Sequence, residues 1–528
     1  MARGYLCFLL HAHLPYVRHP EHDSFLEERW FFEAMTETYI PLINVFDRLL
    51  DDGIDFRVTV SLSPPLVSMF QDEFLQTRYL EHAAKLCELA EREVERTRHD
   101  GSFGHLAVMY RDMFARTVEV FRNRYGCDLV RAFRKFQEAG VLEIMTSAAT
   151  HGFLPLLQTE PSAIRAQILT AADSHRRAFG RPARGLWLPE CGYYPGVEEV
   201  LKEAGVRYFI VESHGMLNAS VRPHYGLLAP VACPNGVAAF GRDPESSKQV
   251  WSSVEGYPGD VSYREFYRDI GYDLDFNYVK PYLQDEQMRV MTGIKYYRVT
   301  GRTDAKEPYR PQQAMERAAT HAGNFMFWRE RQIEHHAAQM DRPPLLVAPY
   351  DAELFGHWWF EGPQWIEFLI RKITFDQQTV KLMTPSEYLA SYPVLQKATP
   401  SASSWGYRGY NEFWLNGGND WVYPHLHRAA GLMKDLVALS KARPLGELGE
   451  RALKQAGRSL LLAQASDWTF IMKTGTSVQY AHQRMRDHLA RFHYLERALR
   501  EGRLDERRLR GLEVMDNIFP DVDPGVFA

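Results

Sequence analysis

Short apolar runs, each followed by a polar, glycine or proline break, recur along the chain. Seven of them stand out, at residues 4–10, 56–62, 141–147, 185–189, 207–212, 345–350 and 380–384. Runs of this length are typical of strands buried in a parallel sheet. Helical patterns lie between them, for example at 36–51, 163–179 and 197–204. This alternation predicts a parallel α/β sheet, either closed into a barrel or doubly wound.

Three stretches depart from the strand–helix alternation. Residues 64–140 contain strong helical patterns and predict a helical insertion. The stretch 214–257 is rich in Gly, Pro, Ser and Tyr, which predicts a loop or lid over the mouth of a barrel. After about residue 395 long amphipathic helices run to the end. We therefore expect a barrel domain at 1–395 and a helical domain at 396–528 that contributes to the cleft.

Titratable side chains follow several of the predicted strands. His11 and His13 come after the first run, His151 after the third, Glu190 after the fourth and Asp351 after the sixth. In a β/α barrel the carboxyl ends of the strands converge on one mouth, where active sites are built. The sequence therefore predicts that these five side chains share one site.

Aromatic residues accompany these polar positions. Aromatic content is 13%, with 11 Trp, and several lie in Gly-rich polar stretches such as those around Trp358 and Trp414. Sugars present flat apolar faces rimmed by hydroxyls, which suits aromatic platforms beside carboxylates. A partly desolvated carboxylate such as Glu190 is what a glycosyl nucleophile requires. The alternatives are that Glu190 caps a helix or pairs with an arginine, and that the aromatics seal the barrel end.

The His11-x-His13 pair leaves two chemistries open. A strand places both rings on one face, which would suit a metal ion if His151, Glu190 or Asp351 supplied further ligands. The same rings could instead bind sugar hydroxyls and tune the carboxylates, or serve a structural role. The pair alone does not separate these hypotheses.

Charge and cysteine content exclude several classes of partner. The formal charge is −5, from 62 basic and 67 acidic residues without a basic block, which argues against nucleic acid or an anionic membrane. Five scattered cysteines show no metal-type spacing and favour a reducing compartment. His11 ends the first apolar run too early for a signal peptide. We expect a cytoplasmic protein without a membrane span, and a monomer because no coiled coil or exposed apolar stripe demands a partner.

Four segments together resemble the signature regions of glycoside hydrolase family 57. They read HAHLPY at 11–16, THGFLPL at 150–156, GLWLPE at 185–190 and PYDAELFGHWW at 349–359. The sequence ASDW at 465–468 also resembles the branching-enzyme group of that family. The resemblance covers nearly the whole chain and implies a (β/α)7 barrel with a helical insertion and a C-terminal all-helical domain.

The resemblance also implies roles for particular residues. Glu190 would be the nucleophile and Asp351 the acid/base of a retaining mechanism, without a metal or cofactor. His11, His13 and His151 would bind the sugar at the cleavage point, and Asp467 would reach the same cleft from the helical domain. Tyr225 occupies the place of a tyrosine on a mobile loop that matters for transfer. The aromatic walls would be Trp30, Trp251, Trp358, Trp405 and Trp414.

The activity implied is that of a 1,4-α-glucan branching enzyme acting on amylose or glycogen. An α-amylase or a 4-α-glucanotransferase of the same family differs only in the acceptor of the last step. From other classes, a zinc-dependent deacetylase or mannosidase would use the His pair, and a non-catalytic glucan-binding protein would use only the aromatic cleft.

Overall fold

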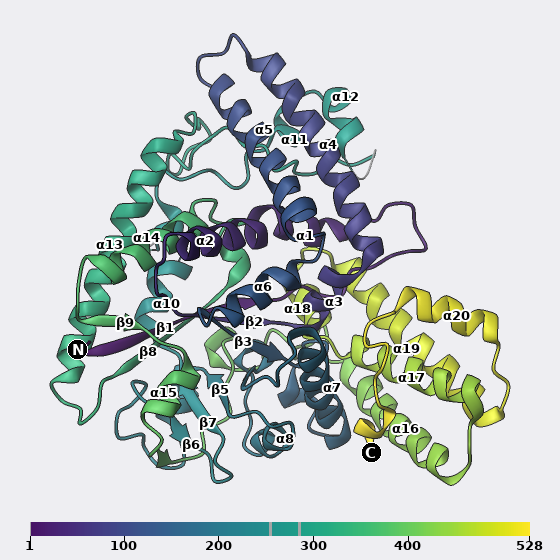
Figure 1. Ribbon diagram of the computed structural model, residues 1–528. Coiled ribbons are helices and arrows are strands. Elements are labelled where there is room, and N and C mark those ends of the chain that lie inside the picture. Colours follow the sequence, from purple (N-terminus) through teal and green to yellow (C-terminus); the bar gives the residue numbers. More distant parts are fainter. Residues whose placement is uncertain (1, 253–255, 284–286) are drawn as a thin grey trace.

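The chain folds around one curled, mostly parallel sheet that is wrapped by helices (Figure 1). The computed structural model describes residues 2–252, 256–283 and 287–528. The strands follow one another in the order β10-β6-β7-β5-β4-β3-β2-β1-β8, with β9 beside β1. Their bounds are β1 (Gly4–Ala12), β2 (Val58–Leu62), β3 (Leu142–Ser147), β4 (Gly185–Trp187), β5 (Tyr208–Val211), β6 (Val231–Ala232), β7 (Ala238–Gly241), β8 (Leu345–Asp351), β9 (Val380–Leu382) and β10 (Gln396–Lys397).

All seven predicted runs form strands, but the sequence analysis missed a strand inside the expected lid. β7 pairs in parallel with β5, from Tyr208 opposite Ala238 to Val211 opposite Gly241. The lid prediction at 214–257 is corrected accordingly, because this stretch also contains β6, α9 (Ser213–Leu217) and α10 (Pro244–Trp251). Residues 253–255 of the predicted lid lie outside the described residues.

The central strand β1 sets the geometry of the mouth. It pairs with β8 in a register that places His11 opposite Asp351, and with β2 so that His11 lies opposite Ser61. On the far side of β8, the backbone N–H of Asp243, just after β7, donates to the carbonyl oxygen of Val347 at 2.8 Å. The sheet thus curls into the barrel implied by the family resemblance, and the carboxyl ends of its strands meet.

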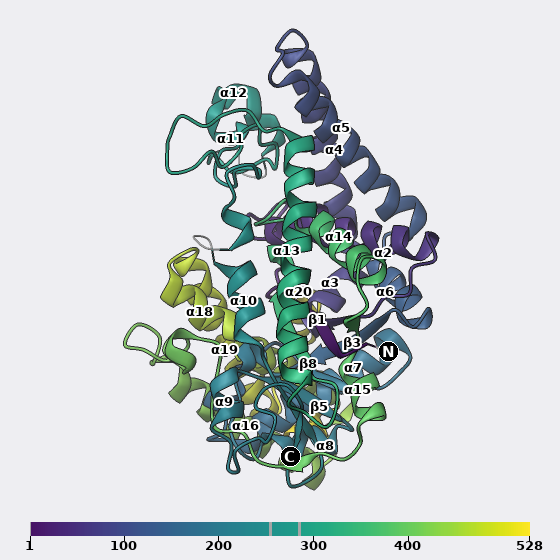
Figure 2. The same cartoon turned by 90° about the vertical axis from the view of Figure 1, so that its left-hand side faces the viewer.

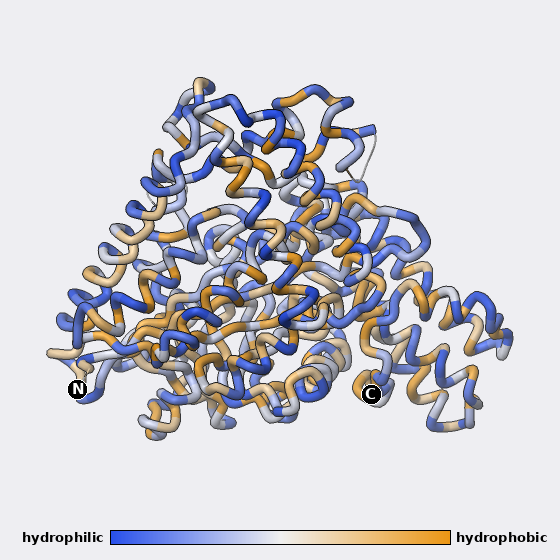
Figure 3. The backbone as a smooth tube through the Cα atoms, turned by 45° about the horizontal axis from the view of Figure 1, so that its top comes forward, coloured by the Kyte–Doolittle hydropathy of each residue, from blue (hydrophilic) through white to orange (hydrophobic). Residues whose placement is uncertain are grey.

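Helices cover the outside of the barrel, and the apolar positions gather where the strands run through its middle (Figure 3). α7 illustrates the local signals: it has Pro161 in its first turn and ends at Gly180, whose φ of 68° suits glycine. The covering helices are α1 (Glu28–Ala34), α2 (Ile40–Asp51), α7 (Pro161–Phe179), α8 (Val197–Glu203), α13 (Pro311–Ala337), α14 (Gly362–Phe375) and α15 (Pro385–Ser391).

The predicted insertion at 64–140 is helical and projects from the barrel (Figures 1 and 2). Glu93, fully buried within it, accepts hydrogen bonds from Tyr278 and Tyr296, each at 2.8 Å. These bonds join the insertion to the segment that follows α10. Its helices are α3 (Pro64–Gln71), α4 (Glu73–Thr97), α5 (Gly104–Glu119) and α6 (Leu129–Glu138), and nearby lie α11 (Ile270–Asp273) and α12 (Phe276–Val279).

The C-terminal part is helical, as expected, and it packs directly on the barrel. Gln167 of α7 donates to Gln464 at 3.0 Å, and Arg484 donates to the carbonyl oxygen of Tyr16 at 3.1 Å. The division at about residue 395 stays a prediction. No helix among the described residues is both long and apolar enough to span a membrane. The C-terminal helices are α16 (Val422–Ala442), α17 (Gly446–Ala463), α18 (Ser466–Thr474), α19 (Val478–Glu501) and α20 (Glu506–Met515).

A glycine after β8 fixes how the mouth meets the π-helical turn η1 (Met35–Tyr39). Gly356 has a φ of 112°, and a Cβ there would collide with the carbonyl oxygen of Glu37. We predict that Gly356→Ala lowers the midpoint of thermal unfolding by several degrees, because both strain and overpacking cost about 1–3 kcal/mol. Gly417→Ala is the matched control, since no atom lies within 4 Å of that position. Equal midpoints for the two variants would contradict this account.

Candidate active site

The carboxyl ends of the barrel strands surround a cavity of about 390 Å³, a size typical of small-molecule sites. Its wall contains residues from the barrel, from the loop after β10 and from α18. Ten of the twelve predicted site residues line it, together with Glu353: His11, His13, Trp30, His151, Glu190, Trp251, Asp351, Trp358, Trp405 and Asp467.

Glu190 lies just after β4 in a strained, tightly held turn. Its φ is 61°, a region that non-glycine residues rarely adopt and that is often associated with function. One carboxylate oxygen accepts a hydrogen bond from Trp405 Nε1 at 2.8 Å, and the other accepts one from Ser466 Oγ at 2.9 Å. Burial raises the pKa of Glu190, while these two donors oppose the rise by stabilising the ionised form. The carboxylate is thus oriented by groups far apart in the sequence.

Asp351 ends β8 on the opposite side of the cavity. Burial raises its pKa well above the usual range, and the negative charges of Glu353 and Glu190 raise it further, against an opposing effect of Arg242. Glu353 is itself fixed by Tyr39, whose hydroxyl donates to it, and by the backbone N–H of His13 at 3.1 Å. A carboxyl that holds its proton beside an ionised carboxylate is the environment of a general acid next to a nucleophile.

Two of the three histidines, His11 and His151, form a hydrogen-bonded chain that reaches Glu190 through Ser466. His11 and His151 join through their Nε2 atoms at 3.1 Å, and His151 Nδ1 lies 2.9 Å from Ser466 Oγ. Because the Ser466 hydroxyl donates to Glu190, we assign the proton of His151 to Nδ1. Burial and the nearby His13 hold the pKa of His11 and His151 well below the usual value.

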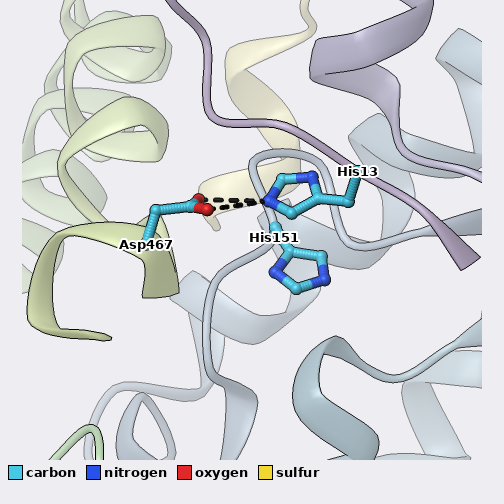
Figure 4. A group of neighbouring side chains, drawn as sticks. All are labelled: His13, His151 and Asp467. Atoms are coloured by element: carbon cyan, nitrogen blue, oxygen red, sulfur yellow. Dashed lines mark hydrogen bonds and ion pairs between the residues drawn. The ribbon is translucent and has the colours of Figure 1, made fainter. Parts of the chain in front are cut away.

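His13 differs from the other two histidines because it faces a carboxylate. Its Nε2 lies 3.1 Å from both carboxylate oxygens of Asp467 (Figure 4). Burial alone would lower the pKa of His13, but Asp467, with Glu190 and Glu353, raises it above the usual value. The raised pKa favours the charged imidazolium, and both ring nitrogens are already engaged, Nε2 by Asp467 and Nδ1 by Ser63 Oγ at 2.8 Å.

The group His13, His151 and Asp467 also has to be tested as a metal site. Each residue offers one ligand atom, and these atoms lie within 4.8 Å of one another. The two imidazole rings, however, are stacked, with centroids 3.7 Å apart and planes 13° from parallel. Ring nitrogens on parallel stacked planes do not converge on one ion as tetrahedral coordination requires. The donor set fits the hydrogen-bonded chain and does not fit the zinc site of the alternative hypothesis.

Trp405 joins the two sides of the site, and other tryptophans form its rim. Besides its bond to Glu190, Trp405 packs edge-on against Trp187 at 5.1 Å and Trp251 at 6.4 Å. Trp358 is 52% exposed and stacks on Phe266 at 4.4 Å, which leaves its other face open. These rings suit the apolar faces of sugars.

Two of the predicted site residues lie elsewhere, and both predictions are corrected. Tyr225 lies beside Arg342, which precedes β8, at the opposite end of that strand from Asp351. Trp414 is only 1% exposed and stacks on Phe153 at 4.4 Å. Because Phe153 belongs to the motif at 150–156 that contains His151, the buried ring of Trp414 packs against the support of the site.

Sequence reasoning missed Ser466, Tyr39 and the site role of Glu353. Ser466 precedes the predicted Asp467, but a serine beside an aspartate carries no signal of its own. Tyr39 closes the π-helical turn η1, a feature that often marks functional sites but that the residue pattern does not reveal. Glu353 follows Asp351 by two residues, so its acidity was the one available signal.

A nucleophile-like and an acid-like carboxyl group, set among histidines and tryptophans at a barrel mouth, define a glycoside-hydrolase type of enzyme. The chain belongs to glycosyl hydrolase family 57, whose family model matches residues 7–399. A second model, described as 1,4-alpha-glucan branching enzyme, C-terminal, matches residues 425–527.

Similar proteins extend over the full length of the chain. A protein named 1,4-alpha-glucan branching enzyme from Thermococcus kodakarensis is 34% identical over 100% of this chain and 79% of its own. A structure described as the alpha-amylase AmyC from Thermotoga maritima is 46% identical, with a TM-score of 0.93, over 100% and 99% of the two chains. A branching enzyme structure from Pyrococcus horikoshii is 34% identical, with a TM-score of 0.89, over 99% and 97%.

The charges around Asp351 predict how the pH profile will respond to mutation. Cleavage needs Glu190 ionised and Asp351 protonated, so the acidic limb of kcat/KM follows Glu190 and the basic limb follows Asp351. Glu353→Gln removes a negative charge that raises the pKa of Asp351. We therefore expect the basic limb of the profile of glycosidic bond cleavage to move to lower pH.

Asp467→Asn is the matched control for this measurement. Asp467 is not among the groups that raise the pKa of Asp351, so its neutralisation should leave the basic limb in place. A basic limb that is unmoved in Glu353→Gln would show that Asp351 does not set it.

The geometry of the histidines predicts no stabilisation by zinc. Because a ligand that binds only the folded state raises the unfolding midpoint, a genuine site would respond to added metal. We expect Zn²⁺ at several times the protein concentration to leave the thermal midpoint unchanged, and metal analysis of purified protein to find less than stoichiometric zinc. A midpoint that rises with Zn²⁺ in the native protein, and not in His13→Ala, would contradict this reading.

Proposed function

We propose that the chain is a 1,4-α-glucan branching enzyme, which cuts an α-1,4 link and joins the released chain to a 6-hydroxyl. The observation that carries the proposal is the position of α18. The region that matches the branching-enzyme C-terminal model contributes Asp467 to the lining of the catalytic cavity and Ser466 as a hydrogen-bond donor to Glu190. The relatives named as branching enzymes, similar over nearly the whole chain, support the same assignment.

The reaction proceeds in two displacements at the anomeric carbon. Glu190 attacks that carbon as the glycosidic bond breaks, and Asp351 gives its proton to the leaving oxygen. The glycosyl part of the donor glucan is then held as an ester on the carboxylate of Glu190. In the second step Asp351 takes the proton of an acceptor hydroxyl, whose oxygen attacks the anomeric carbon and releases Glu190. Two inversions retain the α configuration.

The neighbouring side chains prepare these two groups. Trp405 and Ser466 orient the attacking carboxylate of Glu190 through their hydrogen bonds. Glu353 helps Asp351 keep its proton for the first step. His13, held in place by Asp467 and Ser63, lines the cavity where the sugar binds, and the tryptophans stack on the apolar faces of the glucan.

An α-amylase is the second candidate, and two observations favour it. The Thermotoga maritima structure described as an alpha-amylase is 46% identical to this chain. Tyr225, the expected transfer tyrosine, lies away from the cavity. In this hypothesis water replaces the glucan hydroxyl in the second displacement, and a 4-hydroxyl acceptor would give a 4-α-glucanotransferase. The same catalytic pair serves all three activities.

A monomeric state and a cytoplasmic location remain part of the proposal. The five cysteines are free thiols, which supports a reducing compartment. α-1,4-Glucans such as amylose and glycogen are the proposed substrates.

Incubation with amylose followed by debranching tests the proposed function. We expect new α-1,6-linked side chains that are released by an α-1,6-specific debranching enzyme and resolved by chain-length analysis. Glu190→Gln should reduce turnover at least about 1,000-fold, and Asp351→Asn about 100- to 10,000-fold, because each removes a group needed in the transition state.

Other products of the same incubation would identify the alternatives. New reducing ends without branches would establish an α-amylase, and redistributed linear chains a 4-α-glucanotransferase. Full activity of Glu190→Gln would contradict the catalytic assignment in every case.

A further inference from the structure

A second cavity adjoins the active site on the other side of Trp405. It has a volume of about 410 Å³, and we call it the acceptor cavity. Trp405 lines both cavities, so its indole ring forms part of the wall between them. Charged and polar side chains make up much of its remaining wall: Glu212, His214, Arg242, Ser247, Ser404 and Arg408.

The order of the strands places this cavity on one defined side of the carboxyl pair. Glu190 follows β4 and Asp351 ends β8, so two paths around the barrel join them. The path through β3, β2 and β1 carries the histidines of the first cavity. The other path, through β5 and β7, carries Glu212 and Arg242, just after those strands. The acceptor cavity therefore lies on the side of the carboxyl pair opposite the histidines.

The floor of the acceptor cavity is a fixed ion pair. Arg242 Nη1 donates to Glu212 Oε2 at 3.0 Å, and Arg242 Nε donates to Ser247 Oγ at 2.9 Å. The two charged side chains are only 14% and 15% exposed, so they are held in place. The guanidinium of Arg242 also lies 5.6 Å from the centre of a Trp405 ring. Fixed donors and acceptors beside an aromatic ring are what a sugar with its hydroxyls requires.

The loop at 404–409 forms the outer wall and is held in an unfavourable conformation. Arg408 has a φ of 56°, a left-handed conformation that costs roughly 1–2 kcal/mol for a non-glycine residue. Gly409 follows at 82°, where a Cβ would collide with the ring of His214. The N–H of Ser404 donates to the carbonyl oxygen of Gly409 at 2.9 Å, which closes the turn. Strain that the surroundings maintain often marks a functional segment, and here it presents Arg408 to the cavity.

The same loop offers an aromatic rim. Tyr407 is 49% exposed and Tyr410 60% exposed, on either side of Arg408 and Gly409. Tyr410 packs edge-on against His214 at 5.5 Å, so its position is fixed although its ring is accessible. The seven residues 404–410 thus combine Trp405, Arg408 and two exposed tyrosines.

We propose that the acceptor cavity binds the α-glucan chain whose hydroxyl receives the transferred segment. This inference rests on the proposed glycosyl transfer and names the site that decides its acceptor. Arg408, Glu212 and Arg242 bind the hydroxyls of the incoming chain, while Trp405 and the tyrosines bind its apolar faces. A bound acceptor excludes water from this side of the ester on Glu190.

A chain held in the acceptor cavity takes part in the second displacement, at the carboxyl pair of the neighbouring active site. The acceptor oxygen forms a bond to the anomeric carbon, the ester bond to Glu190 breaks, and Asp351 takes the proton of the acceptor hydroxyl. Water can replace the acceptor in the same step, with hydrolysis as the result. Occupancy of the acceptor cavity therefore sets the ratio of transfer to hydrolysis.

Arg408→Gly is the most informative variant, because it removes the guanidinium and leaves a residue that favours the left-handed conformation. We would use a maltooligosyl fluoride as donor and titrate maltoheptaose as acceptor. Fluoride release reports formation of the ester, and product analysis separates transfer from hydrolysis. In the variant we expect the maltoheptaose concentration for half-maximal transfer to rise at least fivefold and the transfer-to-hydrolysis ratio to fall by a similar factor.

Two further variants make the test specific. Glu212→Gln breaks the ion pair without a change in size and should shift the acceptor dependence in the same direction. This variant provides an independent test if Arg408→Gly folds poorly. Arg503→Gly changes an arginine between α19 and α20 whose side chain is 83% exposed, and it should leave the acceptor dependence unchanged. Thermal unfolding checks that each variant is folded.

The outcomes separate this inference from the proposed function. An unchanged acceptor dependence in both Arg408→Gly and Glu212→Gln would contradict the assignment of this cavity as the acceptor site, even if the enzyme branches amylose. Weakened transfer in these variants, in an enzyme that forms no α-1,6 links, supports the acceptor cavity and contradicts branching. If the native enzyme only hydrolyses the donor at every maltoheptaose concentration, both the acceptor site and the proposed branching activity are contradicted.

Discussion

The rest of the site depends on keeping four carboxyl groups together in one cavity. Glu190, Asp351, Glu353 and Asp467 all line it, and a buried carboxylate without partners is strongly unfavourable. Each group has its own compensation: a proton on Asp351, two hydrogen-bond donors on Glu190, Tyr39 and a backbone N–H on Glu353, and His13 on Asp467. The difference between a protonated Asp351 and a hydrogen-bonded Glu190 is the division of roles that retaining chemistry needs.

These compensating groups explain why the fold has its additional parts. Ser466, which donates to Glu190, begins α18, so the C-terminal helices must pack against the barrel mouth before the nucleophile is oriented. Tyr39 reaches Glu353 from the π-helical turn η1, and the loop after β10 brings Trp405 to Glu190. The strained φ of Glu190 persists because donors from two distant segments hold its carboxylate. The barrel supplies Glu190, Asp351 and Glu353, and the attached segments supply Asp467 and the side chains that bond to Glu190 and Glu353.

The same distinction explains what the sequence could predict. Glu190 and Asp351 follow apolar runs, so a local pattern located both the strands and the carboxyl groups. β7 was missed because its residues, Ala-Ala-Phe-Gly, are few and weakly apolar. Tyr225 was misplaced because position in a connecting loop does not reveal which end of a strand the loop covers. Trp414 has Gly and Asn neighbours typical of a surface loop, yet Phe153, far away in the sequence, covers its ring. Partners such as Ser466 arise only from tertiary packing.

Trp405 makes catalysis and the choice of acceptor interdependent. Its Nε1 fixes Glu190, while its ring forms part of the wall between the active-site cavity and the acceptor cavity. Hydrolysis and transfer proceed from the same ester, so a preference for transfer has to come from interactions made in the second displacement alone. The catalytic pair cannot provide that preference, because it takes part in both reactions. The loop at 404–409 can, since it holds Trp405 against Glu190 and presents Arg408 to the incoming chain. Similar chains can therefore share the catalytic residues and still differ between amylase and branching activity through the walls beyond Trp405.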